Sequence, residues 1–382
     1  MSRTDKSYHI AIDARQLGSQ QSSGIGVVTE ELIKGLVQID HYNRYTALTS
    51  LQKTSSISNV ASNLDNQAVP YAPQSLGEQL LYPDVLARGD YDLIHYTNFN
   101  SPIFFRKAKS IVTIYDLTPW LYPNSPRQRN WICQQLYRFI LKRSCNNASR
   151  IIAVSHGTKV DIVKYIKVDP AKVDVVYSGV PQHIQASESG RDASQILAKY
   201  KIRPPYFLYV GQWRKHKNLV SLLRAFSIFN SRYRDFRLVI VGRPDPLAPE
   251  VPKVIRELNL TDRVVLAGYI PDRDMSPIYK HAQAFIFPSL YEGFGIPPLE
   301  AMASGTPVLS SNASVMPEVL GDAALFFNPL DIENIVQAMY KLVGSPGLRK
   351  ELISKGYHQS QKYSFAQTAR ETLAVYMKVL GQ

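Results

Sequence analysis

The stretch 284–305 constrains the fold of this chain more than any other part, because its residue types prescribe a strand, a loop and a helix in succession. Its apolar start, Ala284–Phe287, has the length and composition of a buried strand. Gly293 and Gly295 then allow the backbone to turn tightly and to approach a ligand closely. The following run, Pro297–Ala303, begins with two prolines, whose missing N–H groups cost nothing in the first turn of a helix.

A helix that starts after such a loop offers free N–H groups and a positive dipole end, which together form a site for phosphate. Two carboxylates flank this site: Glu292 lies at the mouth of the loop and Glu300 in the first helical turn. Because a carboxylate can accept two neighbouring hydroxyl donors, as ribose or a hexose presents them, the combination indicates a nucleoside diphosphate sugar. The spacing of the two glutamates alone would also suit a solvated loop, whereas the complete string favours the ligand site.

The segment Phe287–Gly305 resembles the signature of retaining glycosyltransferases of the GT-B fold, family 4, in which two glutamates are separated by seven residues. The similarity continues through Val308–Asn328 and, more weakly, over most of the chain. The resemblance implies that Glu300 holds the ribose hydroxyls and that Glu292 holds sugar hydroxyls close to the anomeric carbon. It further implies contacts with the nucleotide sugar from four neighbouring residues: Gly293, Phe294, Gly295 and Leu299.

Predicted strands alternate with predicted helices along the chain, a pattern typical of α/β proteins with doubly wound parallel sheets. The polar stretch 182–194 predicts a linker between two domains. The GT-B resemblance implies two Rossmann-like domains that face a cleft. We expect an acceptor-binding N-terminal domain over residues 1–185 and a nucleotide-sugar-binding domain over residues 186–364. The last helix, residues 365–382, is expected to cross back to the first domain.

The first predicted strand, Tyr8–Ile12, leads to a G-x-G turn formed by Gly24 and Gly26, and a helix with an apolar face follows. This pattern is weak by itself, since it also fits a simple loop-to-helix turn and lacks the third glycine of a dinucleotide-binding fingerprint. The resemblance implies that the turn faces the diphosphate of the donor. Further along, the polar stretch 53–75, rich in Ser, Asn and Gln, predicts a loop.

Polar residues at the ends of two further strands are candidates for the sugar site, because ligands bind at the carboxyl ends of strands in α/β sheets. Tyr115 and Asp116 end one of these strands. In the family, the position of Tyr115 usually holds a histidine that contacts the transferred sugar. A tyrosine can still donate a hydrogen bond but stays neutral near pH 7. His95 ends the other strand and could either substitute for that histidine or serve only the fold.

The second domain is expected to open with a strand, Tyr206–Val210, followed by Gly211 and a loop that carries three basic residues and a histidine. Such a loop can converge on phosphate, although it would also suit a solvated basic turn. The resemblance assigns the diphosphate to Lys217. In the family, an arginine often follows the glycine directly, whereas this chain has Gln212 after Gly211. Arg214, two residues later, would then supply that positive charge. The resemblance also implies that two residues pack around the base: Tyr269 and Ile270.

The segment Asp272-Arg273-Asp274 reads D-x-D, which is the metal clamp of a different glycosyltransferase fold. It precedes a short helix predicted to start near Met275, so we expect a helix cap with two exposed acids there instead of a metal site. Cys133 and Cys145 lack metal-ligand spacing and indicate free thiols in a reducing cytosol. We therefore expect no metal and no cofactor, and the habit of the family suggests UDP-glucose or GDP-mannose as the donor.

The formal net charge of +13 favours an anionic partner, such as a nucleotide, a lipid diphosphate or a membrane surface. Residues 126–150 hold six basic residues and no acidic one, and apolar residues recur there at helical spacing. This basic amphipathic helix could lie on an anionic membrane, or it could pack normally with its basic face in water. No membrane-spanning run or signal-peptide core is evident, so we expect a cytoplasmic protein, with the inner face of the cytoplasmic membrane as an alternative location.

The leading functional prediction is a metal-independent retaining hexosyltransferase. It would move glucose or mannose from a nucleoside diphosphate sugar to a sugar or lipid-linked acceptor in polysaccharide or glycoconjugate synthesis. An NAD-dependent oxidoreductase would need the complete G-x-G-x-x-G pattern, which the chain lacks. A nucleic-acid binder is suggested by charge alone, without a recognition motif. An inactive nucleotide-binding scaffold is disfavoured because three key residues are intact: Glu292, Glu300 and Lys217.

Overall fold

The computed structural model describes residues 6–17, 24–50, 57, 60–181, 192–246 and 248–381. The chain forms two compact units, each of which contains more than one segment of the sequence. The first unit comprises Met1–Trp120, Asn130–Gly179 and Ser364–Gln382, and the second comprises Leu121–Arg129 and Val180–Tyr363. Most of the predicted linker 182–194, including the expected domain boundary, lies outside the described residues.

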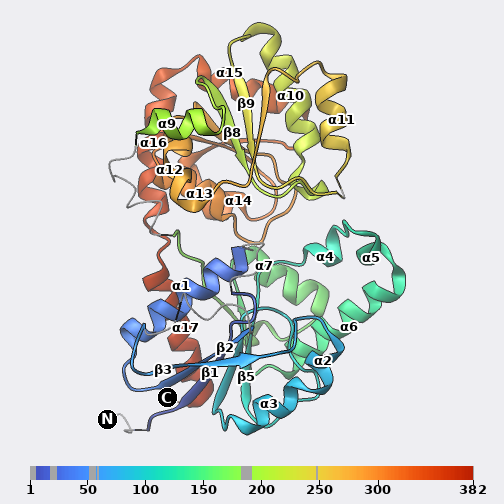
Figure 1. The fold of residues 1–382 in the computed structure, drawn as a ribbon, viewed down its shortest axis with the longest axis vertical. Helices are drawn as coiled ribbons and strands as arrows, with labels where there is room; N and C mark the ends of the chain where they lie inside the picture. The colour runs from blue at the N-terminus through green and yellow to red at the C-terminus, as the bar shows by residue number, and fades with distance from the viewer. Residues whose placement is uncertain are drawn as a thin grey trace. The chain divides into compact units, whose positions relative to one another are not determined.

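The first unit is built on a parallel sheet of seven strands in the order β3-β2-β1-β4-β5-β6-β7 (Figure 1). Its strands are β1 (His9–Asp13), β2 (Arg44–Ser50), β3 (Leu64–Val69), β4 (Leu93–Tyr96), β5 (Lys109–Ile114), β6 (Arg150–Ala153) and β7 (Val173–Val175). Its helical segments are α1 (Gly24–Ile39), α2 (Leu76–Leu80), α3 (Tyr82–Arg88), α4 (Thr118–Leu121, ending one residue into the second unit), α6 (Trp131–Asn147), α7 (His156–Asp161), η1 (Ile162–Ile166), η2 (Pro170–Lys172) and α17 (Phe365–Leu380).

The strand β3 corrects the prediction that residues 53–75 form a loop. It pairs in parallel with β2 at the edge of the sheet, and Val69 is its one buried residue. Because an edge strand of this kind buries so little apolar surface, it shows none of the apolar patterning from which a strand can be predicted.

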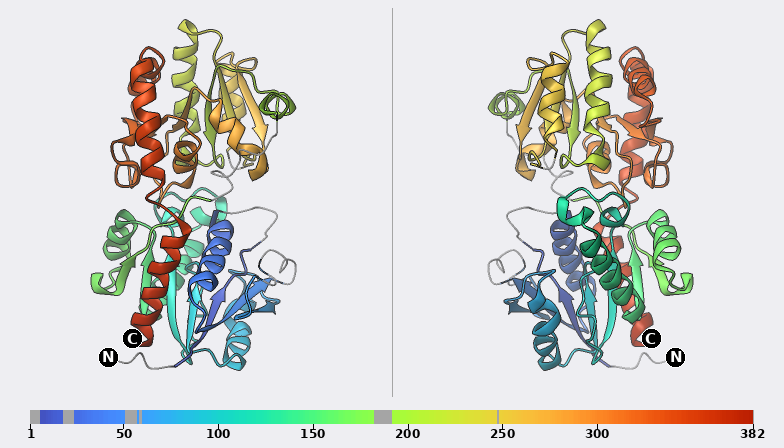
Figure 2. Two further views of the ribbon diagram at one scale, coloured as in Figure 1. Left: turned by 90° about the vertical axis from the view of Figure 1, so that its left-hand side faces the viewer. Right: turned by 90° about the vertical axis from the view of Figure 1, so that its right-hand side faces the viewer.

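The last helix, α17, lies alongside α1 in the first unit (Figure 2). The two helices approach closely at Gly35, where an added Cβ would come within 2.9 Å of the Cβ of Ala369. His95 also joins this part of the core: its Nδ1 lies 2.7 Å from the Tyr376 hydroxyl and its Nε2 lies 2.7 Å from the Thr113 hydroxyl. Burial lowers the pKa of His95 to about 3, so the side chain is neutral and serves the fold.

The second unit is built on a parallel sheet of six strands in the order β10-β9-β8-β11-β12-β13. Its strands are β8 (Tyr206–Val210), β9 (Arg237–Val241), β10 (Val264–Gly268), β11 (Ala284–Phe287), β12 (Val308–Ser311) and β13 (Ala324–Phe327). Its helical segments are α5 (Pro126–Arg129), α9 (Ala193–Lys199), η3 (Lys215–Lys217), α10 (Leu219–Arg232), α11 (Glu250–Glu257), α12 (Asp272–Lys280), α13 (Ile296–Ala303), α14 (Met316–Leu320), η4 (Gly321–Ala323), α15 (Ile332–Val343) and α16 (Pro346–Ser360).

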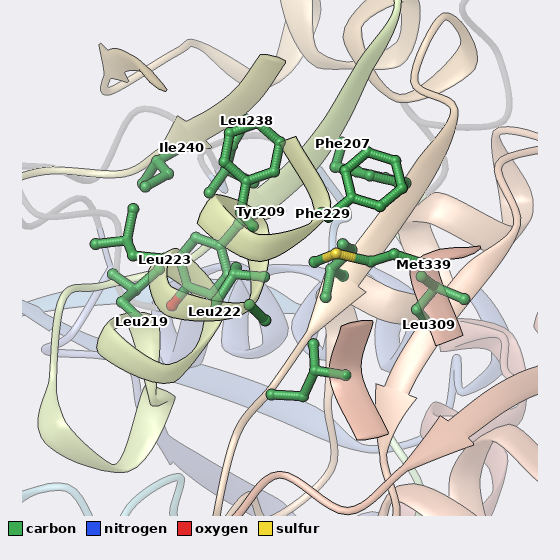
Figure 3. Packing of buried hydrophobic residues seen from close by; sticks show 14 of the residues in the cluster. Phe207, Tyr209, Leu219, Leu222, Leu223, Phe229, Leu238, Ile240, Leu309 and Met339 are labelled. Atoms are coloured by element: carbon green, nitrogen blue, oxygen red, sulfur yellow. The ribbon is translucent and has the colours of Figure 1, made fainter. Parts of the chain in front are cut away.

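The core of the second unit lies between its sheet and the helices α10 and α15. Figure 3 shows Phe207 of β8 beside Phe229 of α10, with Met339 of α15 close by. Phe207 and Phe229 meet edge to face with their ring centroids 5.1 Å apart, a favourable geometry for aromatic pairs. Together, the two sheets confirm the predicted fold class of two doubly wound parallel α/β domains.

Candidate active site

The glycine loop and α13 have the local structure that the residues predict. Gly295 adopts a left-handed backbone with φ of 99° and immediately precedes α13, whose first turn contains the two prolines. An added Cβ at Gly295 would lie 2.6 Å from the terminal methyl of Met316, which is the movable end of a flexible side chain, so the left-handed backbone is the main reason for glycine here. The backbone at the end of the loop therefore has a conformation that favours glycine.

Lys217 and Glu292 form an ion pair at the mouth of this loop. The Lys217 Nζ lies 2.6 Å from Glu292 Oε1, and the side chains are only 19% and 12% exposed. The neighbouring Asn218 holds the lysine loop in place, because its side-chain amide donates to the carbonyls of Pro288 and Pro329 at 3.2 and 2.8 Å. Residues 75 positions apart in sequence thus meet at the ends of the adjacent strands β8 and β11.

Glu292 is also fixed through its backbone. The hydroxyl of Ser314 donates to the Glu292 carbonyl at 2.8 Å and accepts from the Glu292 N–H at 3.3 Å. Ser314 itself adopts a left-handed backbone with φ of 56°. The Ser314 hydroxyl therefore holds the backbone of Glu292 through both its N–H and its carbonyl group.

Glu300 lies on α13 and is partly buried. The Tyr279 hydroxyl donates to its Oε2 at 2.8 Å. Burial raises the pKa of Glu300 to about 7, the Tyr279 hydrogen bond opposes this shift, and the negative charge of Asp272 adds to it. The ionised and protonated forms of this carboxyl are therefore both populated near neutral pH.

The basic loop after β8 does not bring all its charges to one point. Arg214 is 40% exposed and its Nε lies 3.9 Å from Asp245 Oδ2. Arg214 also lines a cavity of about 200 Å³ together with Trp213, Lys215 and Glu250. Gly211 lies at the crossing of the loops after β8 and β9, where a Cβ added to Gly242 would be 2.1 Å from the Gly211 carbonyl oxygen.

His216, the histidine of this loop, faces the segment Leu121–Arg129 of the second unit. Its Nδ1 lies 3.2 Å from the amide nitrogen of Asn124, and the ring of Tyr122 stacks on Tyr291 with centroids 5.6 Å apart. Burial lowers the pKa of His216 to about 3, and the charges of Lys217 and Arg214 act in the same direction. The histidine therefore adds no positive charge for a phosphate at neutral pH.

The residues expected around the base and the sugar differ in exposure. Tyr269 is 47% exposed, and the guanidinium of Arg243 lies 5.1 Å from the centre of its ring. Ile270 is 3% exposed and Leu299 is fully buried, so their side chains belong to the core. The ring of Phe294 is also buried and meets Tyr363 edge to face, so this side chain packs within the second unit.

The predicted site residues of the first unit lie at the ends of its strands and at the start of α1. Gly24 and Gly26 form the first turn of α1, and the loop before them lies outside the described residues. Tyr115 and Asp116 follow β5 directly. Burial raises the pKa of Tyr115, so its phenol is neutral. The Asp116 carboxylate accepts from the Thr118 N–H at 2.6 Å, at the start of the short helix α4.

The D-x-D segment differs in part from the expected cap with two exposed acids, since Asp272 is exposed but Asp274 is not. The helix α12 begins at Asp272 itself, and Asp274 is only 4% exposed. The Asp274 carboxylate accepts from Lys199 and Tyr200 at 2.8 and 2.6 Å, so it joins α9 to α12. Within the described ranges, no cluster of three or more metal-ligating side chains occurs.

Comparison with known proteins decides the family. The model of the family described as "Glycosyltransferase Family 4" matches residues 22–183. The model of the family described as "Glycosyl transferases group 1" matches residues 193–359. The O-antigen chain mannosyltransferase RfbU of Salmonella typhimurium is 30% identical over 277 residues, which cover 72% of this chain and 71% of that protein. The chain belongs to glycosyltransferase family 4.

Two further similarities extend over nearly the whole of this glycosyltransferase. The O-antigen chain mannosyltransferase B of Escherichia coli is 27% identical over 375 residues, which are 93% of this chain and 96% of that protein. The structure of sucrose-phosphate synthase from Thermosynechococcus elongatus superposes with a TM-score of 0.78 at 19% identity and covers 98% of this chain and 100% of that one. At that identity, the structural likeness supports the GT-B fold alone.

Sequence reasoning assigned no positioning role to three residues of the candidate site of this glycosyltransferase: Asn218, Ser314 and Tyr279. Asn218 adjoins the predicted lysine, and its left-handed backbone is one that asparagine adopts more readily than most residues. Ser314 and Tyr279 carry no comparable local signal, because their partners lie 22 and 21 positions away and meet them only in the folded chain.

Proposed function

We propose that this glycosyltransferase is a retaining hexosyltransferase that takes a hexose from a nucleoside diphosphate sugar. The observation that carries the proposal is the ion pair of Lys217 and Glu292 at 2.6 Å beside the start of α13. A bound donor would break this ion pair and bind both side chains. Its diphosphate would then contact Lys217, and its sugar hydroxyls would contact Glu292. Glu300 accepts the ribose hydroxyls in this arrangement.

The proposed chemistry proceeds on one face of the sugar. The bond from the anomeric carbon to the diphosphate oxygen breaks, and the acceptor oxygen bonds to the same carbon from the same side. The proton of the acceptor hydroxyl passes to the departing diphosphate. Lys217 and the N-terminal end of α13 stabilise the leaving negative charge, and the exposed Arg214 adds positive charge from the same loop at a longer distance, while Glu292 stabilises the positive charge that develops on the sugar ring.

We infer mannose as the first donor sugar to test and glucose as the second. Mannose is supported by two relatives described as O-antigen chain mannosyltransferases, one of which is matched over nearly its whole length. The proposed acceptor is a sugar or a lipid-linked sugar in glycoconjugate synthesis. A screen of GDP-mannose and UDP-glucose, scored by release of free nucleotide, tests the donor; faster release of GDP supports mannose. Binding without release from any donor would favour the inactive scaffold.

We expect activity to survive a chelator, because protein cations carry the phosphate charge in this proposal. Transfer in the presence of EDTA should match transfer in untreated buffer, measured as nucleotide release over the same interval. Complete loss of activity that manganese or magnesium restores would contradict the metal-independent mechanism. A manganese-dependent glycosyltransferase treated in parallel is the control for effective chelation.

We also propose that the protein binds an anionic membrane through the exposed face of α6. The helix predicted over residues 126–150 is in fact divided at Asn130, whose side chain accepts from the Cys133 N–H and caps α6. The helix α6 packs through Leu141, Ser144 and Cys145. Four large apolar residues on it are at least half exposed: Trp131, Ile132, Leu136 and Phe139.

Charge supports an anionic surface as the partner of this face, since α6 carries Arg138, Lys142 and Arg143 and no acidic residue. Arg138 and Lys142 lie over the ring of Trp120, so replacing them would also remove contacts within the protein. Replacing exposed apolar residues of α6 therefore tests membrane binding more directly. Within the part of the chain that the structure describes, no helix is long and apolar enough to cross a membrane.

Replacing Leu136 and Phe139 together with serine should weaken binding to anionic liposomes at least about tenfold, because two apolar side chains no longer enter the interface. Cosedimentation measures the binding, and nucleotide release should stay at the parent rate. Leu330→Ser is the matched control, since Leu330 is 80% exposed in the second unit. Equal binding of the double variant and the parent would leave α6 as a helix with a solvated face.

A further inference from the structure

Tyr279 makes the one hydrogen bond that reaches the Glu300 carboxylate within the described residues. Its side chain is fully buried on α12, and its hydroxyl donates to Glu300 Oε2 at 2.8 Å. A carboxylate has about four acceptor positions on two oxygens. Oε1 and one lone pair of Oε2 therefore remain for a ligand.

Two hydroxyl groups from distant parts of the chain hold the backbone of α12 at and beside Tyr279. Tyr206 at the start of β8 donates to the Ile278 carbonyl at 2.6 Å, and Thr306 donates to the Tyr279 carbonyl itself at 2.6 Å. The ring lies 5.8 Å from that of Phe285 in β11. The phenol is thus fixed by the core, before any ligand is present.

The charge state of Glu300 depends on few neighbours. Within the described residues, the titratable groups that act on its pKa are Tyr279 and Asp272, both on α12. The elements α16, β11 and β12, which also pack against α13, contribute no charged group to this shift. Burial and Asp272 favour the protonated acid, whereas the hydrogen bond from Tyr279 favours the carboxylate.

We propose that Tyr279 is a positioning residue of the donor site, whose hydroxyl holds one oxygen of Glu300 and leaves the other to accept the ribose hydroxyls. The inference rests on the proposed function, in which Glu300 binds the ribose. A protonated Glu300 would offer one acceptor fewer and a competing donor, so the hold of Tyr279 also maintains the form that binds. Asp272, in the first turn of the same helix, opposes this effect of Tyr279 because its negative charge favours the protonated form of Glu300.

The test compares Tyr279→Phe and Asp272→Asn with the parent by calorimetry with GDP and UDP between pH 6 and pH 9. The ratio of variant to parent affinity is used, because titration of the nucleotide phosphate then cancels. Tyr279→Phe should weaken binding about threefold or more at pH 7 and by less at pH 9, where Glu300 is ionised in both and only the loss of orientation remains. Asp272→Asn should strengthen binding at pH 6 and match the parent at pH 9.

A loss in Tyr279→Phe that is the same at every pH would overturn the proposal, since it would show general damage to the site. Glu300→Gln should bind weakly, with no pH dependence beyond that of the nucleotide. Tyr376→Phe is the matched control, because it removes a buried tyrosine hydroxyl in the first unit and should leave nucleotide binding unchanged.

A second measurement separates this inference from the proposed function. The carboxyl carbon of Glu300, assigned by comparison with Glu300→Gln, is titrated by NMR in the protein without nucleotide. Its midpoint should rise in Tyr279→Phe and fall in Asp272→Asn, and an unchanged midpoint in Tyr279→Phe would refute the hold on Glu300. If the midpoints move but Glu300→Gln binds GDP and UDP as the parent does, the ribose assignment fails while the role of Tyr279 stands.

Discussion

Glu292→Gln should lower the rate of sugar transfer by about two to three orders of magnitude, as the removal of one preorganised electrostatic contact does. Glutamine keeps the shape and part of the hydrogen bonding, but it cannot stabilise positive charge on the sugar ring. Affinity for free nucleoside diphosphate should equal or exceed that of the parent, because the variant frees Lys217 from its partner at 2.6 Å. Initial rates with GDP-mannose and calorimetry with GDP measure the two effects.

Glu257→Gln is a suitable control for this variant, since it removes the carboxylate of another lysine pair, Lys253 and Glu257, on the exposed face of α11. Its rate should match that of the parent. A parent-like rate in Glu292→Gln would remove Glu292 from the catalytic site. A glycosyl adduct on Glu292, trapped with a slow fluorinated donor and detected by mass spectrometry, would make it a nucleophile instead. An inverted product would contradict retention itself.

Lys217→Ala should weaken nucleoside diphosphate binding by about tenfold to a hundredfold, because a hydrogen bond to a charged group contributes roughly 1.5–3 kcal/mol. The variant also leaves the Glu292 carboxylate, only 12% exposed, without its cation, and that charge then repels the diphosphate. Nucleoside binding should not change, since the lysine acts on phosphate alone. Calorimetry with GDP and guanosine gives both numbers.

The double variant Lys217→Ala with Glu292→Gln provides the sharpest check of the pair. Removing both charges takes away the repulsion, so diphosphate affinity should recover in part compared with Lys217→Ala alone. Such non-additivity is expected of residues in direct contact. Equal losses of GDP and guanosine binding in Lys217→Ala would indicate a damaged fold. Strictly additive effects in the double variant would show that the two side chains do not compete for the donor.

Much of the site could be predicted because its parts are local. The apolar run of β11, the glycines of the loop and the prolines of α13 act through backbone preferences within a few residues, so neighbouring residue types suffice to define them. The alternation of strands and helices likewise predicts parallel sheets, since parallel strands need a crossover connection. The prediction of one helix over residues 126–150 was wrong at Asn130. This residue caps the start of a new helix, α6, and the apolar pattern did not reveal that break.

Tertiary structure decided which side chains meet and what charge they carry. Lys217 reaches Glu292 because β8 and β11 are neighbours in the second sheet, an order that no single segment specifies. Asp274 joins α9 through Lys199, and His216 loses its charge through burial. The sequence by itself therefore determined the elements, the family signature and the charged residues near the donor loop. Their pairing and protonation depend on contacts between distant segments, which exist only in the folded protein.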